Sequence, residues 1–233
     1  MKRAFKLPMT VAERVAGIAY IPVHAFVLPL GLYFLFPLLG LELKSVNLTL
    51  AAYTVSFIFI LLTTFKFLKA SFADMFDGFS RILQSVAVGI VVYFVANMAV
   101  AFLLGQFMEN LVNPNSQEVI DEVKLNPDAM LVVSVLFAPV VEETMFRGAL
   151  FGSIRRRARV AAYAVSAAAF ALYHLWPYFL SDFRWVDLLY TLQYIPAAIV
   201  LAWCFERGGS IWSSITLHAL INLIASVSIK WQV

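Results

Sequence analysis

The chain has 233 residues, of which 62% are hydrophobic and 13% charged, with a net charge of +3 and a mean hydropathy of +0.86. This composition excludes an ordinary soluble globular domain and is typical of a multi-pass membrane protein. The basic residues lie mostly in short loops between apolar segments, which is the pattern of membrane topology signals, so no nucleic-acid partner is implied. The only cysteine, Cys204, excludes an internal disulfide and a cysteine-based metal cluster.

Seven apolar segments predict an all-α, multi-pass transmembrane bundle. In chain order they are 15–39, 48–65, 82–107, 129–154, 160–175, 186–205 and 211–229. The first follows a basic start but is too long for a signal-peptide core, so we expect a retained span. Residues 66–81 alternate apolar and charged side chains, which favours an amphipathic helix at the membrane interface.

Residues 108–128 form the only long polar segment and mark the largest change in composition. The turn signal at residues 113–116 predicts a short surface helix over 117–124. We therefore expect two parts, an accessory part with transmembrane helices and an acidic loop (1–128) and a functional core of helices (129–233).

The distribution of lysine and arginine orients the predicted bundle. With the N-terminus inside, twelve basic residues fall in inner segments and four in outer ones, which by the positive-inside rule places the N-terminus inside and the C-terminus outside. The inner residues are Lys2, Arg3, Lys6, Arg14, Lys66, Lys69, Arg81, Arg155, Arg156, Arg157, Arg159 and Arg207, and the outer ones are Lys44, Lys124, Arg184 and Lys230.

The fourth predicted span contains two carboxylates and a guanidinium, Glu142, Glu143 and Arg147. Ionisable groups in a span usually face the protein interior and serve a purpose, because each costs roughly 2.5 to 3.5 kcal/mol on insertion scales. Glu143 and Arg147 are spaced i,i+4 and should pair, which leaves Glu142 available for chemistry. Pro139 could kink the helix beside them. The alternative is an ion pair that only locks helices together.

Later spans add further polar groups. His174 closes the fifth span, and His218 and Asn222 share one face of the seventh. At about 1.5 Å per residue, Glu142 and His174 lie on the order of 20 Å from the inner ends of their helices, whereas His218 comes out shallower, at about 12 Å. The remaining histidine, His24, is expected to be structural.

The three polar motifs together resemble a known family. EETMFR fits the pattern EExxxR, FALYH fits FxxxH and HALIN fits HxxxN, in the order found in the CPBP (Abi) family of CAAX prenyl endopeptidases and bacteriocin-processing and self-immunity proteins. The resemblance covers about residues 129–229. It implies an intramembrane glutamate-type endopeptidase without a cofactor, in which Glu142 and His174 activate water, Glu143 and Arg147 support them, and His218 and Asn222 stabilise the oxyanion.

Other functions stay open at this point. Glu142, His174 and His218 are acceptable zinc ligands, although the chain has no HExxH motif. A non-catalytic membrane immunity or interaction protein could use the same cavity, and a transporter could use the same buried carboxylates. For an enzyme, we expect a membrane-anchored protein or peptide as substrate, either a lipidated CAAX-like protein, a sorting tag or a peptide precursor. The expected location is the bilayer of a prokaryotic cell (inner) membrane, and the oligomeric state is undetermined.

Overall fold

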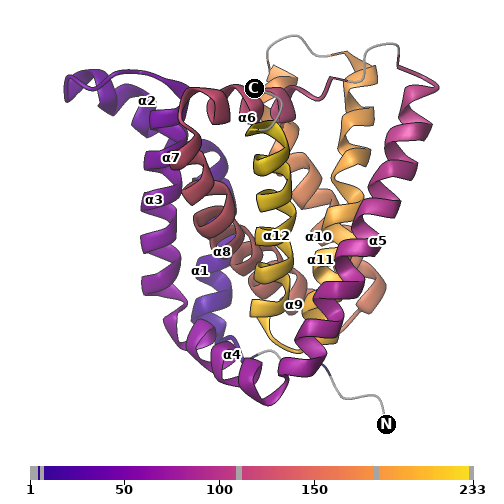
Figure 1. Ribbon diagram of the computed structural model, residues 1–233. Helices are drawn as coiled ribbons and strands as arrows, with labels where there is room; N and C mark the ends of the chain where they lie inside the picture. The colour runs from indigo at the N-terminus through magenta and orange to yellow at the C-terminus, as the bar shows by residue number, and fades with distance from the viewer. Residues whose placement is uncertain (1–4, 6–7, 109–111, 181–183, 231–233) are drawn as a thin grey trace.

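The computed structural model describes residues 5, 8–108, 112–180 and 184–230, which form helices joined by short connections (Figure 1). Lys2, Arg3 and Lys6 of the charge analysis lie outside the described residues. The helices are α1 (Val11–Pro22), η1 (Val23–Val27), α2 (Leu28–Leu38), α3 (Ser45–Thr63), α4 (Phe65–Asp77), α5 (Phe79–Gly105), α6 (Pro114–Leu125), α7 (Pro127–Val132), η2 (Val133–Phe137), α8 (Ala138–Glu142), η3 (Glu143–Phe151), α9 (Gly152–Arg155), α10 (Arg159–Leu175), η4 (Trp176–Leu180), η5 (Trp185–Gln193), α11 (Ile195–Gly208) and α12 (Ile211–Lys230).

Seven continuous helical segments are long and apolar enough to cross a membrane, which confirms the predicted fold class and identifies an integral membrane protein. They are Val11–Leu38, Ser45–Thr63, Phe79–Gly105, Pro127–Arg155, Arg159–Phe179, Asp187–Gly208 and Ile211–Lys230. The largest differences from the predicted boundaries are four residues, at the start of the first segment and at the end of the fifth.

Proline explains why two of these spans change their winding. Pro29 and Pro139 each lie two residues after a π-helical stretch, η1 and η2 respectively. A proline ring clashes with the carbonyl four residues earlier and offers no N–H, and a wider turn accommodates both defects. The local distortion expected near Pro139 is therefore a π-helical turn, and it directly precedes α8, which ends at Glu142.

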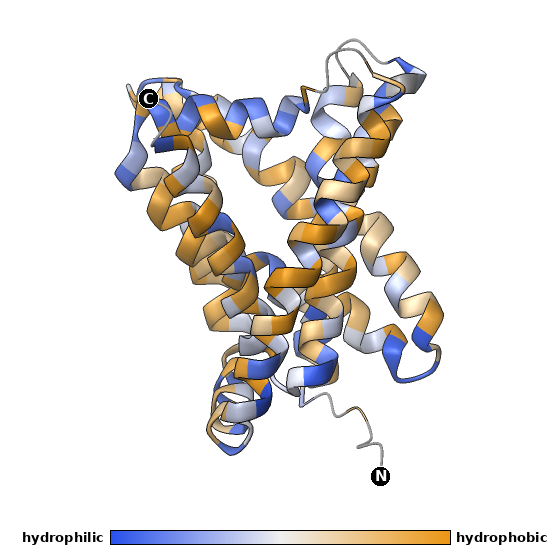
Figure 2. Ribbon diagram, turned by 45° about the vertical axis from the view of Figure 1, so that its right-hand side comes forward, coloured by the Kyte–Doolittle hydropathy of each residue, from blue (hydrophilic) through white to orange (hydrophobic). Residues whose placement is uncertain are grey.

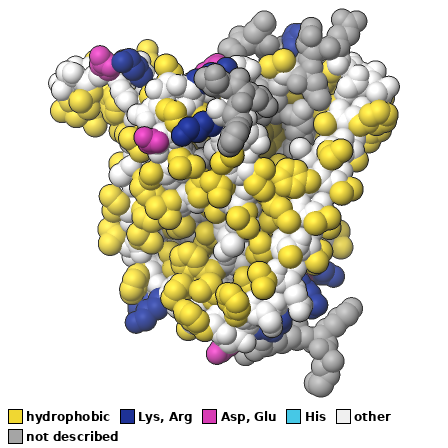
Figure 3. All heavy atoms as spheres, in the orientation of Figure 1, with side chains coloured by type: hydrophobic (Ala, Val, Ile, Leu, Met, Phe, Trp, Pro, Cys, Tyr) yellow, Lys and Arg dark blue, Asp and Glu magenta, His cyan; other side chains and the backbone are white. Residues whose placement is uncertain are grey.

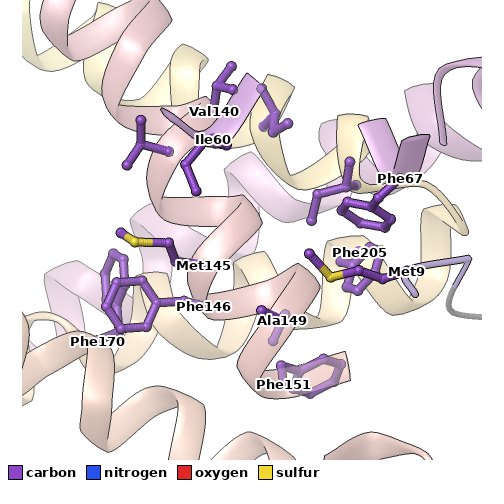
Figure 4. Close-up of a cluster of buried hydrophobic side chains, with 14 of the residues drawn as sticks. Met9, Ile60, Phe67, Val140, Met145, Phe146, Ala149, Phe151, Phe170 and Phe205 are labelled. Atoms are coloured by element: carbon purple, nitrogen blue, oxygen red, sulfur yellow. The ribbon is translucent and has the colours of Figure 1, made fainter. Parts of the chain in front are cut away.

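The fourth span is the centre of the bundle. In its most apolar window 67% of the residues are buried, compared with 11% in the span formed by α5 at the edge (Figure 1). Figure 4 shows side chains of η3 packed within the main core, with Phe146 beside Phe170. A helix surrounded on all sides by protein can hold charged groups away from lipid.

The outer surface is apolar in the middle and charged at the two ends. Hydropathy colouring and the space-filling view both show this distribution (Figures 2 and 3). On α5, for example, Val95, Met98 and Phe102 are 64 to 70% exposed. A band of exposed apolar side chains of this kind matches the hydrocarbon core of a bilayer.

Two shorter helices lie at opposite ends of the bundle (Figure 1). α4 lies at the same end as the N-terminus, within the segment predicted to be amphipathic, and Glu13 of α1 fixes its start by accepting a hydrogen bond from the Phe67 N–H at 2.8 Å. α6 lies at the end where α12 finishes, and Asn113 caps it. The predicted surface helix thus exists and begins three residues earlier than expected.

Candidate active site

Two adjacent carboxylates lie at the middle of the fourth span. Glu142 is the last residue of α8 and Glu143 the first residue of the π-helical segment η3. Their residues are 3% and 0% exposed, respectively. Both therefore face the protein interior, as expected for ionisable groups in a membrane span.

Glu143 and Arg147 form the expected ion pair. Arg147 Nη1 donates to Glu143 Oε1 at 2.9 Å, and Nη2 donates to the Ala198 carbonyl at 3.3 Å. The guanidinium carbon lies 4.1 Å from the centre of the Phe170 ring. Three neighbours on different helices thus hold this fully buried cation.

His218 on α12 reaches both glutamates. Its Nδ1 lies 2.9 Å from Glu143 Oε1 and its Nε2 lies 4.0 Å from Glu142 Oε2. The residue count placed His218 shallower than Glu142, yet the two side chains lie within 4.0 Å of each other. A carboxylate only accepts hydrogen bonds, so Nδ1 carries the hydrogen that is shared with Glu143.

His174 near the end of α10 approaches Glu142 from another side. Its Nδ1 donates to the Phe170 carbonyl at 2.8 Å, since a carbonyl can only accept. Its Nε2 lies 3.8 Å from Glu142 Oε2. In the neutral ring this Nε2 is an acceptor, and it faces a carboxylate oxygen that is an acceptor too.

Glu142 is held through its other oxygen by a residue that the sequence did not indicate. The Tyr53 hydroxyl of α3 donates to Glu142 Oε1 at 2.6 Å and lies 3.2 Å from the Tyr173 hydroxyl. Glu142 Oε2 has no hydrogen-bond partner among the described residues. Tyr173 belongs to the FALYH motif and could have been noticed, whereas nothing marks Tyr53 within its apolar span.

His24 lies beside these tyrosines. Its Nδ1 is 2.7 Å from Ser56 Oγ, and its ring centre is 5.0 Å from that of Tyr53 and 5.7 Å from that of Tyr173. The ring therefore packs against the tyrosines that surround Glu142 and bonds to Ser56. Its structural role remains a prediction.

Asn222 lies one turn after His218. Its amide Nδ2 donates to the Ser134 carbonyl at 2.8 Å, which uses one of its two hydrogens. Together with His174 and His218 it lines a cavity of about 280 Å³. The structure thus brings the six residues of the three motifs to one region between α8, η3, α10 and α12.

The zinc alternative involves the same atoms. Glu142, His174 and His218 converge, with their facing oxygen and nitrogens 3.8 and 4.0 Å apart. No group of three or more His, Cys, Asp or Glu side chains in the described part of the chain has the arrangement of a metal site.

Comparison with known proteins supports the resemblance seen in the motifs. Residues 125–224 match the family described as type II CAAX prenyl endopeptidase Rce1-like, which confirms the expected family resemblance. No solved structure matches the chain.

Three curated proteins are similar to parts of the chain. The UPF0177 protein YxdF of Lactococcus lactis is 28% identical over 95 residues, covering 41% of this chain and 47% of that protein. YdiL of Bacillus subtilis, named as a proposed membrane peptidase, is 27% identical over 109 residues, covering 46% and 40%. The UPF0177 protein YaiF of L. lactis is 30% identical over 145 residues, covering 59% of each. The matches thus span less than two thirds of each relative.

Proposed function

From the match of residues 125–224 to the Rce1-like endopeptidases, we propose that the chain is an endopeptidase that works inside the membrane. The observation that carries this proposal is the convergence of Glu142 Oε2 with the Nε2 atoms of His174 and His218, at 3.8 and 4.0 Å. A buried carboxylate oxygen that has no hydrogen-bond partner among the described residues and faces two imidazoles is suited to bind and activate one small polar molecule.

Water is the nucleophile in this proposal. Glu142 Oε2 and His174 Nε2 are both acceptors and lie 3.8 Å apart, so a water molecule between them can donate one hydrogen to each. Its oxygen then attacks the scissile carbonyl carbon while one proton passes to the Glu142–His174 pair. The same proton goes on to the leaving amine when the C–N bond breaks.

His218 and Asn222 are proposed to stabilise the oxyanion. The His218 Nδ1–H is shared with Glu143, so a second proton on Nε2 gives an imidazolium whose charge that carboxylate balances. The second amide hydrogen of Asn222 is available beside it, because the first goes to Ser134. Two donors on one helix face can meet the charge that develops on the carbonyl oxygen.

The proposed substrate is a protein or peptide held in the same bilayer as the enzyme. The three motifs lie in membrane-spanning helices, so a substrate that is already anchored reaches them without leaving the membrane. We propose a prokaryotic cell membrane, with the N-terminus inside, and catalysis without a cofactor.

The test compares protein termini in membranes of host cells expressing the natural chain or Glu142→Gln at matched levels. Glutamine keeps the shape of the side chain and removes its basicity, so termini produced by the natural chain should be absent. Glu42→Gln, at an exposed residue, is the matched control and should leave them in place. Identical profiles for the natural chain and Glu142→Gln would contradict proteolysis and favour a non-catalytic immunity or interaction protein.

A further inference from the structure

The cavity of about 280 Å³ lies directly against the candidate site. His174 and His218 line it, so each ring has the cavity on one side and Glu142 within 4.0 Å. Its remaining walls come from α5, α6, η5, α11 and α12. A substrate in this cavity would therefore contact the two imidazoles proposed to act in hydrolysis.

The walls carry neutral polar groups beside the two imidazoles. Asn97, Gln193 and Asn222 contribute amides and Tyr93 a hydroxyl, and no Asp, Glu, Lys or Arg is among the described residues that line the cavity. Tyr93 and Asn97 are one turn apart on α5, a helix whose other faces expose apolar side chains to lipid. In a chain with so few polar residues, this concentration of amides on the cavity wall favours a polar ligand.

Several of these groups have no protein partner. Gln193 Oε1 accepts from Asn113 and the Asn222 amide nitrogen donates to Ser134, at 2.6 and 2.8 Å. Within the described chain, no hydrogen bond uses the Gln193 amide nitrogen, the Asn222 carbonyl oxygen or the Asn97 amide. Donors and acceptors on these half-buried side chains are thus both left over along one cavity, where a ligand can use them.

Resting on the proposed function, we infer that this cavity binds an extended peptide segment with uncharged side chains, through its main-chain amides. Alternating N–H and C=O groups match a wall that offers both donors and acceptors. An isoprenoid chain would leave the same amides without partners. The substrate class is therefore an unlipidated stretch of peptide.

The placement of α6 gives the direction of entry. Ser116 of α6 and its N-cap residue Asn113 line the cavity, and α6 lies at the end of the bundle opposite the start of α1 (Figure 1). The peptide segment is thus expected to reach the site from that end, which is the outer side in the predicted orientation.

Binding is tested separately from cleavage in the Glu142→Gln background. The probe is a fluorophore-labelled dodecapeptide of Ala, Ser, Asn and Gly with blocked ends, titrated against purified protein in detergent and followed by anisotropy. We expect saturable binding that becomes about tenfold weaker with Asn97→Leu, since one amide's hydrogen bonds are lost. Met98→Leu, on the neighbouring lipid-facing residue, should leave binding unchanged.

Competition identifies the ligand class. Farnesyl-cysteine methyl ester should not displace the labelled peptide. Displacement by the farnesyl compound, no saturable binding, or an unchanged affinity in Asn97→Leu would overturn the inference. If the peptide binds as expected but the natural chain cleaves nothing in cells, the proposed function fails while the peptide-binding cavity stands.

Discussion

Replacing Arg147 with alanine tests the central ion pair. The variant removes the Nη1 bond to Glu143, the Nη2 bond to the Ala198 carbonyl and the contact with the Phe170 ring. Glu143 stays 0% exposed and keeps only the His218 Nδ1–H as a partner among the described residues. The variant therefore leaves a buried carboxylate with one of its two positive or donating neighbours missing.

The expected loss in the free energy of unfolding follows from these contacts. Breaking a buried ion pair by removing one partner costs about 3 to 5 kcal/mol. Because His218 still donates to Glu143, we take the lower end, about 3 kcal/mol. For a chain of this length each kcal/mol shifts the melting temperature by about 2 to 4 °C, so the midpoint should fall by about 6 to 12 °C.

Thermal unfolding in mild detergent measures this shift. Arg157→Ala is the control, because Arg157 is an exposed arginine in the same half of the chain and should stay close to the natural midpoint. Glu143→Gln combined with Arg147→Met removes both charges and should recover part of the loss. An Arg147→Ala midpoint equal to that of Arg157→Ala would refute the assignment of a stabilising buried pair.

Three further predictions concern the surroundings of the site. Tyr53→Phe should slow cleavage by about 10- to 100-fold with KM nearly unchanged, since a hydrogen bond to a charged group is worth about 1.5 to 3 kcal/mol. An unaltered rate, or an equal loss in the exposed control Tyr33→Phe, would contradict this role. Burial raises the pKa of the Glu122 carboxyl, against the hydrogen bond from Thr49, so its neutral form is favoured in the folded state. Stability should thus fall as pH rises from the ordinary pKa through the raised one, and Glu122→Gln should remove that slope in denaturation curves measured across pH. Cleavage should persist after dialysis against a chelator, and activity lost by chelation and restored by zinc would instead favour Glu142 as a metal ligand.

The fold was predictable because a bilayer restricts what a chain can do. Each span must be helical, about 20 residues long and mainly apolar, so hydropathy alone placed every segment within four residues. The π-helical turns were harder to predict from the sequence, since proline predicts a distortion without specifying its winding. Here the distortion near Pro139 is a wider turn directly before the glutamates.

The site was predictable only where ionisable residues interrupt the apolar sequence of a span. Glu142, Arg147, His174 and His218 are conspicuous for that reason, and the structure brings them together. Tyr53 was not, because tyrosine is ordinary in an apolar span and its hydroxyl reaches Glu142 across 89 residues of sequence. Depth counted along single helices did not indicate that His218 meets both glutamates, because such a count says nothing of how neighbouring helices are placed.

The charges around Glu142 and Glu143 explain why two adjacent carboxylates suit this site. Two carboxylates beside one guanidinium leave one negative charge in excess, and His218 lies within 4.0 Å of both carboxylates. In the proposed mechanism His218 carries the balancing positive charge. Negative charge then leaves Glu142, as it takes up the proton of water, and develops on the carbonyl oxygen facing His218. The four side chains and the substrate oxygen together keep a total charge of zero while the negative charge moves by a few ångströms. Because net charge is costly in a low-dielectric interior, such a transfer between neighbouring groups is a physically sound way to run the proposed hydrolysis within a membrane.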